Sequence, residues 1–350
     1  MQDSLQLSMQ LSTQDLNKPV RIIFFSDTHL GAAHTSRPGR RKNHRSEDFT
    51  RCFETVVDHA ISSKADLLIH GGDLFNRSKP PADIVYQAYE KILQAADELP
   101  VLMLAGNHER AQLPPYLFLQ HRNIHIFDEP KTFRFSFRGK SFCFGGFPHQ
   151  KKIRTGFMGL VDRSGIFDQP ADYRYLCVHQ TVEGARVGPN GYTFRHGDDV
   201  ISASHIPGGL TAVLSGHIHR QQILDTVTPV VYCGSTERTS FAEADETKSF
   251  CELIPTEDHI EFVPLPATPM NSLSVPNELT GSQAQRFIED WCRCQQHRAV
   301  IRIKFETFPG GEVLRKVNKS WLWRLFPDAS AIQISVDGGW SKVRRSSAWK

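Results

Sequence analysis

Residues 20–31 read VRIIFFSDTHLG, and this stretch decides which fold the chain can adopt. Its first half is a mainly apolar run that predicts a buried β-strand, and Asp27 and His29 follow that run two positions apart. In an extended chain, side chains at this spacing point to the same face. Because an unpaired charge at a buried strand end is costly, the carboxylate and the imidazole need a common partner. The candidate partner is a metal ion.

The residues that follow alternate between helical and strand patterns. Residues 48–61 place apolar side chains at helical spacing, and residues 80–99 open with two prolines at an expected helix start. Each helix is followed by a short apolar run, at residues 67–70 and 101–105. Two strand–helix–strand units in succession predict a parallel sheet with helices on its faces. The expected fold class is therefore α/β.

The pattern becomes richer in strands after Ile124. Residues 132–147 alternate around a turn, as in a β-hairpin, and hairpin-like segments recur between residues 221 and 265. Further buried strands are expected at residues 173–179 and 212–216. These patterns predict a second group of strands in the same domain.

The last part of the chain differs in composition. From Asn277 to Lys350 there are 13 Lys and Arg against 7 Asp and Glu, although the whole chain carries a net charge of only +3. All 5 tryptophans lie in this part, and a proline-containing stretch before it resembles a linker. We expect a polar N-terminal extension, a large domain, a linker, and a small basic α/β domain with a tail, at residues 1–19, 20–265, 266–278 and 279–350. Within the small domain, helix, strand, helix and strand patterns occupy residues 282–295, 299–306, 311–326 and 331–336.

Composition and cysteine usage limit the class of protein. With 350 residues, 39% of them hydrophobic, the chain is long enough for a well-packed core. No run approaches the roughly 20 apolar residues of a membrane-spanning helix, and residues 1–19 lack the features of a signal peptide. The 7 cysteines are odd in number, and several lie inside apolar runs, which indicates core residues rather than disulfides. We therefore expect a cytoplasmic protein with no membrane partner.

Polar side chains follow five of the expected strands, each at the end of its strand. These residues are Asp27 and His29, Asp73, Asn107 and His108, His179, and His217 and His219. In open α/β folds, ligands gather outside the carboxyl ends of the strands, so we expect these side chains to meet at one rim. Glycines beside several of them allow the backbone to turn sharply next to the site.

These donors suit two metal ions rather than one. Two carboxylates, four imidazoles and one amide oxygen are too many for a tetrahedral ion, but they suit two ions that share a carboxylate. The first ion would take Asp27, His29 and His219, the second Asn107, His179 and His217, and Asp73 would bridge them. Oxygen and nitrogen donors without thiolates indicate manganese, iron or zinc ions rather than a structural zinc site. Of these we expect manganese, with iron, zinc or magnesium as alternatives. Such ion pairs serve phosphoryl transfer, and His108 remains free to protonate a departing alkoxide.

In their order along the chain, these segments resemble the signature of the calcineurin-like metallophosphoesterases. The segments are DTH, GGD, GNHE, a lone histidine after a strand, and GHIH. Within that superfamily the chain is similar to SbcD-type DNA repair nucleases, because it contains DTHLG, GGDLF followed by a proline pair, and GSTERTSFAEADETKSF. The resemblance covers residues 20–265 and implies a four-layer αββα core, followed by a small α/β cap domain.

The resemblance also implies a function. SbcD-type proteins are two-metal-dependent DNA phosphodiesterases, with 3′ to 5′ exonuclease and single-strand endonuclease activity in DNA repair or end processing. It further implies an SbcC-like SMC-type ATPase as partner, and a homodimer. DNA is then the expected substrate, and His108 is the expected catalytic residue.

Three features depart from the pattern of that family. Glu109 stands where these nucleases usually carry Asp, and it is typical of serine/threonine protein phosphatases. Asn76 stands where several relatives have a histidine implicated in exonuclease action. No long amphipathic helix follows the last expected strand, although such a helix would dock on an ATPase coiled coil.

A basic segment follows the first metal motif and offers contacts to a DNA backbone. In SRPGRRKNHR, the candidates are Arg40, Arg41 and Arg45, although such a segment is also typical of a solvated loop. Two other functions stay open. The first is a metallophosphatase acting on a protein or a small molecule, which Glu109 favours. The second is a DNA-end binding scaffold without chemistry.

Overall fold

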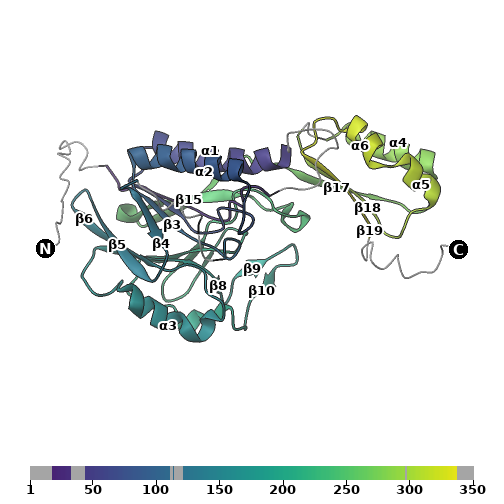
Figure 1. Cartoon of the computed structure of the whole chain (residues 1–350). Coiled ribbons are helices and arrows are strands. Elements are labelled where there is room, and N and C mark those ends of the chain that lie inside the picture. The colour runs from purple at the N-terminus through teal and green to yellow at the C-terminus, as the bar shows by residue number, and fades with distance from the viewer. Residues whose placement is uncertain (1–17, 33–43, 111–112, 114–120, 296–297, 337–350) are drawn as a thin grey trace.

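The computed structural model describes residues 18–32, 44–110, 113, 121–295 and 298–336. Within these residues the chain forms two six-stranded sheets, a three-stranded sheet and two two-stranded ribbons. Figure 1 shows the two large sheets packed on one another between helices, with the three-stranded sheet to one side. The first residues of the chain and the basic segment up to residue 43 lie outside the described part.

The first large sheet grows from the strand that opens the fold. Its order is β16-β15-β1-β2-β3-β4, with β1 to β4 parallel and β15 and β16 added as an antiparallel hairpin. The strands span Ile22–Phe25 (β1), Leu67–His70 (β2), Val101–Leu104 (β3), Ile124–Phe127 (β4), Ser249–Ile254 (β15) and His259–Pro264 (β16). Helices α1 (His44–Ser62) and α2 (Ala82–Glu98) connect the parallel strands, which confirms the two predicted strand–helix–strand units.

The second large sheet has the order β13-β14-β12-β7-β6-β5. Its strands span Lys131–Phe137 (β5), Lys140–Gly146 (β6), Tyr173–His179 (β7), Ala212–Gly216 (β12), Gln222–Leu224 (β13) and Val230–Tyr232 (β14). The four central strands are parallel, and hairpins close both edges. Gly216 pairs with His179, so β7 and β12 end level with one another.

The two sheets and three helices form four layers. Side chains from both sheets, such as Phe24 and Phe144, fill the apolar layer between them. On the outer face of the first sheet, Phe25 packs with Phe53 from α1. Helix α3 (Ile153–Ser164), which the sequence analysis did not anticipate, covers the outer face of the second sheet. The predicted αββα core is therefore confirmed.

The C-terminal part forms a parallel sheet of order β17-β18-β19. Its strands are Met270–Val275, Val300–Phe305 and Ala331–Val336, and its helices are α4 (Gly281–Cys292), α5 (Gly311–Lys316) and α6 (Lys319–Leu325). The helices share an apolar core with one face of the sheet, and Trp323 lies in that core. The division of the chain into domains stays a prediction.

Two expectations for this part were wrong in detail. Strand β17 lies inside the expected linker, where pairing with β18 orders a stretch that is short and bounded by prolines. The expected helix at residues 311–326 is two helices. The break comes at Asn318, whose side chain accepts a hydrogen bond from the amide of Trp321 and so starts a new helix.

Short elements complete the described chain. They are β8 (Thr181–Val182) with β11 (Val200–Ile201), β9 (Arg186–Val187) with β10 (Tyr192–Thr193), and the 3₁₀ turns η2 (Ala203–His205), η3 (Phe241–Glu243) and η4 (Pro255–Glu257). None of the helices in the described residues is long and apolar enough to cross a membrane. All 7 cysteines are free thiols, and five of them are buried, as their apolar surroundings in the sequence indicated.

Candidate metal centre

The structure brings the seven predicted ligands together at the carboxyl ends of five strands. Asp27 and His29 follow β1, Asp73 follows β2, Asn107 follows β3, His179 ends β7, and His217 and His219 follow β12. Strands β1 to β3 belong to the first large sheet, whereas β7 and β12 belong to the second. The site therefore lies where the ends of both sheets meet, and neither sheet supplies it alone.

The backbone at the site is not extended, as the sequence analysis had assumed. The angle φ is +52° at Asp27, +49° at His29, +54° at Asp73 and +86° at His217, so all four residues are left-handed. Asp27 and His29 thus converge because the chain turns at each of them, and the argument from extended spacing was wrong. Their amides donate hydrogen bonds of 2.9 Å to the carbonyls of Gly72 and Asp73, which ties this turn to the end of β2. Such strain is typical of functional sites.

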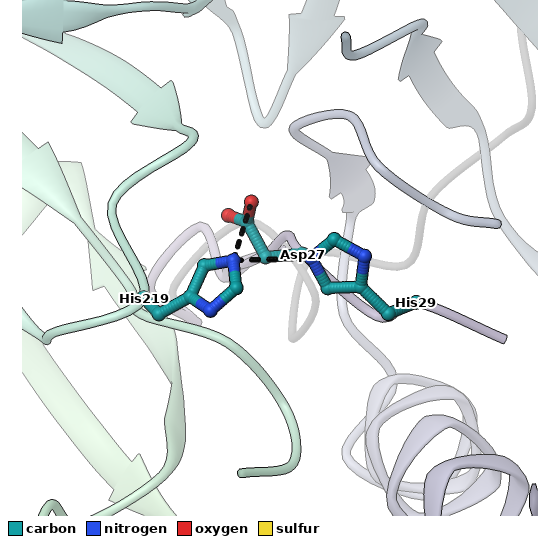
Figure 2. A group of neighbouring side chains, drawn as sticks. All are labelled: Asp27, His29 and His219. Carbon is teal, nitrogen blue, oxygen red and sulfur yellow. Dashed lines mark hydrogen bonds and ion pairs between the residues drawn. The ribbon is translucent and has the colours of Figure 1, made fainter. Parts of the chain in front are cut away.

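Asp27, His29 and His219 form the first group of donors, shown in Figure 2. The Nε2 atoms of the two histidines are 3.0 Å apart, and Nε2 of His219 lies 3.7 Å from Oδ1 of Asp27. One donor atom from each residue lies within 4.8 Å of the other two. This spacing allows the three side chains to ligate one ion.

Asn107, His179 and His217 form the second group. Oδ1 of Asn107 lies 3.2 Å from Nε2 of His179 and 2.8 Å from Nδ1 of His217. The two imidazole rings meet edge to face, with 5.2 Å between their centroids. One amide oxygen and two ring nitrogens therefore face the same point.

The carboxylate of Asp73 lies between the two groups. Its Oδ2 is 3.9 Å from Nε2 of His29 and 3.4 Å from Nε2 of His179. Gly106 leaves room for it, because a Cβ at that position would lie 2.1 Å from Oδ1 of Asp73. Asp73 thus contacts both groups, and Oδ1 of Asp27 also lies 3.9 Å from Nε2 of His179.

Hydrogen bonds behind two of the rings decide which nitrogen faces the site. Nδ1 of His179 lies 2.8 Å from the carbonyl oxygen of Gly71, and Nδ1 of His219 lies 3.0 Å from Oε1 of Glu243. A carbonyl or carboxylate oxygen only accepts, so in both histidines Nδ1 carries the proton. When these two rings are neutral, both Nε2 atoms present a lone pair to the site.

Burial and nearby charges shift the pKa values of the histidines. Burial lowers the pKa of His217 to about 3. Burial, together with the neighbouring His219, also lowers the pKa of His29. Burial acts against the charged form of His179 as well, but the carboxylate of Asp73 raises its pKa to about 9. Burial also acts against the charged form of His219, but the hydrogen bond to Glu243 raises its pKa. His29 and His217 are therefore neutral near pH 7, whereas His179 and His219 must release a proton to ligate a metal.

The donor set fits divalent cations. Asp27 and Asp73 are only 0% and 2% exposed, and in the described residues their ion-pair contacts are all to histidines. Two buried carboxylates need a compensating positive charge, which the neutral imidazoles of His29 and His217 do not supply. Oxygen and nitrogen donors grouped around a shared carboxylate suit two divalent ions.

His108 stands at the edge of the site rather than among the inner donors. Its Nδ1 lies 2.8 Å from the backbone carbonyl oxygen of Asn76, and its Nε2 lies 3.9 Å from Oδ2 of Asp73. Its side chain is 40% exposed, so a substrate can reach it. Asn76 thus contacts His108 through its backbone carbonyl oxygen.

Glu109 fastens two loops together. Its carboxylate accepts hydrogen bonds from the amides of Gly106 (2.8 Å) and Phe75 (2.6 Å). Burial, helped by the charge of Asp73, raises its pKa to about 8. Its position explains why an acidic residue follows His108, namely to tie the turn after β3 to the turn after β2.

Two residues near the site were missed in the sequence analysis. Glu243, from η3, contacts His219 as described above. His149 follows β6, and its ring centroid lies 6.1 Å from that of His179 and 5.9 Å from that of His217. A signal for His149 existed, because it follows closely on a strand that ends in two glycines, and glycine also directly precedes Asp73, Asn107 and His217. Glu243 lies within GSTERTSFAEADETKSF, one of the segments that carry the family resemblance, but the sequence analysis assigned it no role.

Of the three candidate DNA-binding arginines, the described residues include Arg45. Arg40 and Arg41 lie outside the described residues. Arg45 is fully buried, and its guanidinium lies 3.3 Å from Oδ2 of Asp48 and 3.4 Å from Oε1 of Glu237. The prediction that Arg45 contacts DNA was therefore wrong, because its charge is already paired inside the protein.

The chain is similar to a protein family model, to curated proteins and to solved structures. Residues 20–221 match the family model described as calcineurin-like phosphoesterase. The chain is 28% identical over 240 residues to the DNA double-strand break repair protein Mre11 of Methanosarcina acetivorans, covering 67% of this chain and 36% of that protein. It is 26% identical over 273 residues to the protein of the same name from Aeropyrum pernix, covering 73% and 63%. Among solved structures, TT1561 of Thermus thermophilus gives a TM-score of 0.46 at 12% identity, covering 71% of this chain and 99% of that chain.

The match covers less than two thirds of the length of either Mre11 relative. The family model, in contrast, matches more than half of this chain and includes all seven donors. The chain therefore belongs to the calcineurin-like phosphoesterase family.

Proposed function

We propose that this phosphoesterase hydrolyses DNA phosphodiesters with the help of two divalent ions. The observation that carries the proposal is the position of Asp73, whose Oδ2 lies within 3.9 Å of nitrogens from both donor groups. A carboxylate shared in this way is typical of two-metal sites for phosphoryl transfer. The relatives are named as DNA double-strand break repair proteins, which supports DNA as the substrate.

The finer activity rests on the resemblance to SbcD-type nucleases. We propose a 3′ to 5′ exonuclease with single-strand endonuclease activity, manganese as the ion, an SbcC-like SMC-type ATPase as partner, and a homodimer. The separate apolar core of β17 to β19 and their helices supports a cap domain in the C-terminal part. Free cysteines suit a reducing compartment such as the cytoplasm.

The chain's own residues would orient the reacting groups. Asp27, His29 and His219 would hold one ion, Asn107, His179 and His217 the other, and Asp73 both. When bound, the ions would supply positive charge to the phosphate oxygens and lower the pKa of a water molecule. The buried backbone turns at Asp27 and Asp73 fix the carboxylates before substrate arrives, so little reorganisation is needed.

His108 is the proposed general acid. A protonated His108 keeps its hydrogen bond from Nδ1 to the carbonyl of Asn76, so its second proton lies on Nε2. That nitrogen is 3.9 Å from Asp73 and belongs to an exposed side chain. It can therefore pass a proton to the departing 3′ oxygen of a bound diester.

The alternative of a phosphatase gains no support from Glu109. The hydrogen bonds of that carboxylate go to the backbone of the loops, where they have no bearing on substrate choice. A scaffold without chemistry has no use for seven converging donors. The nuclease is therefore the proposal that we carry forward.

One assay separates the three functions. We expect manganese-dependent release of nucleotides from end-labelled duplex and single-stranded DNA, with inhibition by added salt. His108→Ala should lose this activity, whereas His259→Ala, which alters a half-exposed histidine outside the site, should keep it. Hydrolysis of a generic phosphomonoester alone would instead support the phosphatase, and DNA binding without turnover would support the scaffold.

A further inference from the structure

Glu243 lies directly behind His219, on the side away from the other donors. Its Oε1 is 3.0 Å from Nδ1 of His219 and also accepts a hydrogen bond from Oγ1 of Thr239. Its Oε2 accepts from the amide of Thr239 at 3.1 Å. Glu243 is 7% exposed, so water competes little for these bonds. Its carboxylate is thus held in one place, with one oxygen directed at the imidazole.

Lys248 fixes both the carboxylate and the histidine backbone. Its Nζ lies 2.6 Å from Oε2 of Glu243 and donates a hydrogen bond of 3.1 Å to the carbonyl oxygen of His219. The lysine is 1% exposed. His219 is therefore held at its ring by Glu243 and at its backbone by Lys248.

His219 is treated differently from the other histidines of the site. In His179, the acceptor that faces Nδ1 is a backbone carbonyl oxygen, that of Gly71, rather than a carboxylate. Nδ1 of His29 is buried and has no hydrogen-bond partner in the described part of the chain. An ionised carboxylate is a stronger acceptor than a carbonyl, and it raises the basicity of the opposite ring nitrogen.

We infer that Glu243 is a positioning residue, which holds the proton of His219 on Nδ1 and so keeps Nε2 directed at the first ion. The inference rests on the metal site of the proposed function, and it adds the residue that tunes one ligand of that site. Removal of such a partner typically weakens metal binding by 10-fold to 100-fold. The loss should fall on one of the two ions, because the ring that Glu243 holds belongs to the first donor group.

The test is calorimetric titration of the metal-free chain with manganese. Wild type should bind two ions. Glu243→Ala should bind one of them about 10-fold to 100-fold more weakly. Glu243→Gln, whose amide oxygen can still accept from Nδ1, should lose less. Nuclease activity of Glu243→Ala should recover at high manganese concentration, with the KM for DNA unchanged, which a simple loss of folding would not produce.

Glu246 provides a matched control. It also pairs with Lys248, at 3.0 Å, but its carboxylate does not hold the ring of His219. Glu246→Gln should therefore bind both ions as wild type does. Equal manganese affinities for wild type and Glu243→Ala would overturn the inference while leaving the proposed function intact. Equal losses of manganese affinity in Glu243→Gln and Glu246→Gln would also overturn the inference, because the loss would then result from the changed environment of Lys248. If wild type itself bound no manganese, the proposed function would fail together with the inference.

Discussion

Replacing Arg45 with methionine should destabilise the protein without weakening DNA binding. Arg45 is fully buried in α1, and its guanidinium contacts the carboxylates of Asp48 and Glu237, which are also fully buried. It also lies over the ring of Phe49, at 4.6 Å from the centroid. Methionine retains much of the side-chain volume but removes the charge. Two buried carboxylates would then lose a cation.

The other contacts of these carboxylates set the expected size of the effect. Asp48 keeps Arg298 at 2.8 Å and Arg51 at 3.1 Å, so it stays compensated. Glu237 keeps neutral amide donors, from Arg238 at 2.7 Å and Thr268 at 2.8 Å. Breaking a buried ion pair from one side costs about 3–5 kcal/mol of unfolding free energy. Because one of the two carboxylates stays paired with cations, we expect the lower part of that range, about 3 kcal/mol.

Urea unfolding followed by circular dichroism would measure this loss, and fluorescence anisotropy on labelled DNA at several salt concentrations would measure binding. Arg51→Met is a control, since the Arg51 side chain is 36% exposed and its loss should cost no more than about 1 kcal/mol. The double variant Arg45→Met with Glu237→Gln should recover part of the stability, because it also removes the carboxylate that lost its cation. A stability change below about 1 kcal/mol, together with a DNA-binding salt slope reduced by about one, would refute this reasoning and restore Arg45 as a phosphate contact.

Two further predictions concern the metal site, and a third concerns His70, the buried histidine that ends β2. Asp73→Asn should abolish the binding of at least one manganese ion and lower nuclease activity at least about 100-fold. Metal analysis and a DNA degradation assay would measure these two losses. Two tightly bound ions in the variant would contradict a shared carboxylate. His108→Gln should keep both ions and lose about 100-fold to 10,000-fold in DNA hydrolysis, so an unchanged rate would exclude it as general acid. For His70, burial lowers the pKa from 6.5 to about 3, so the unfolded chain takes up a proton that the folded chain refuses between these values. The unfolding free energy should therefore fall as the pH drops through this window, by up to roughly 1.4 kcal/mol per pH unit more in wild type than in His70→Gln. Equal shifts of the urea midpoint in the two proteins between pH 7 and pH 5 would argue against this role of His70.

Much of the first sheet could be predicted from the sequence, because local pattern and tertiary environment agree there. The runs that became β1, β2 and β3 are apolar, are separated by helices of amphipathic spacing, and end in glycine or a polar residue. Strands buried on both faces appear in a sequence as continuous apolar runs, so the ends of these strands could be located. The polar residues after them could then be expected at one rim of the sheet. That the two donor groups meet at Asp73 could be expected from the order of the strands, because no local feature of the sequence indicates it.

The elements that escaped prediction depend on distant partners. Strand β17 is ordered by its register with β18, and prolines on either side conceal it. Arg45 resembles the rest of a basic loop, and only the approach of Glu237 from the far end of the domain shows that it is buried. Glu243 meets His219 through the same kind of long-range folding. Sequence spacing gives no information about such pairs.

The left-handed backbone at Asp27, His29, Asp73 and His217 limits which side chains can replace these four donors. Aspartate, asparagine and histidine enter this conformation more readily than most residues, whereas bulky and β-branched side chains are strained there. The turn that directs each donor at the site therefore also narrows the set of substitutions that the backbone tolerates at that position.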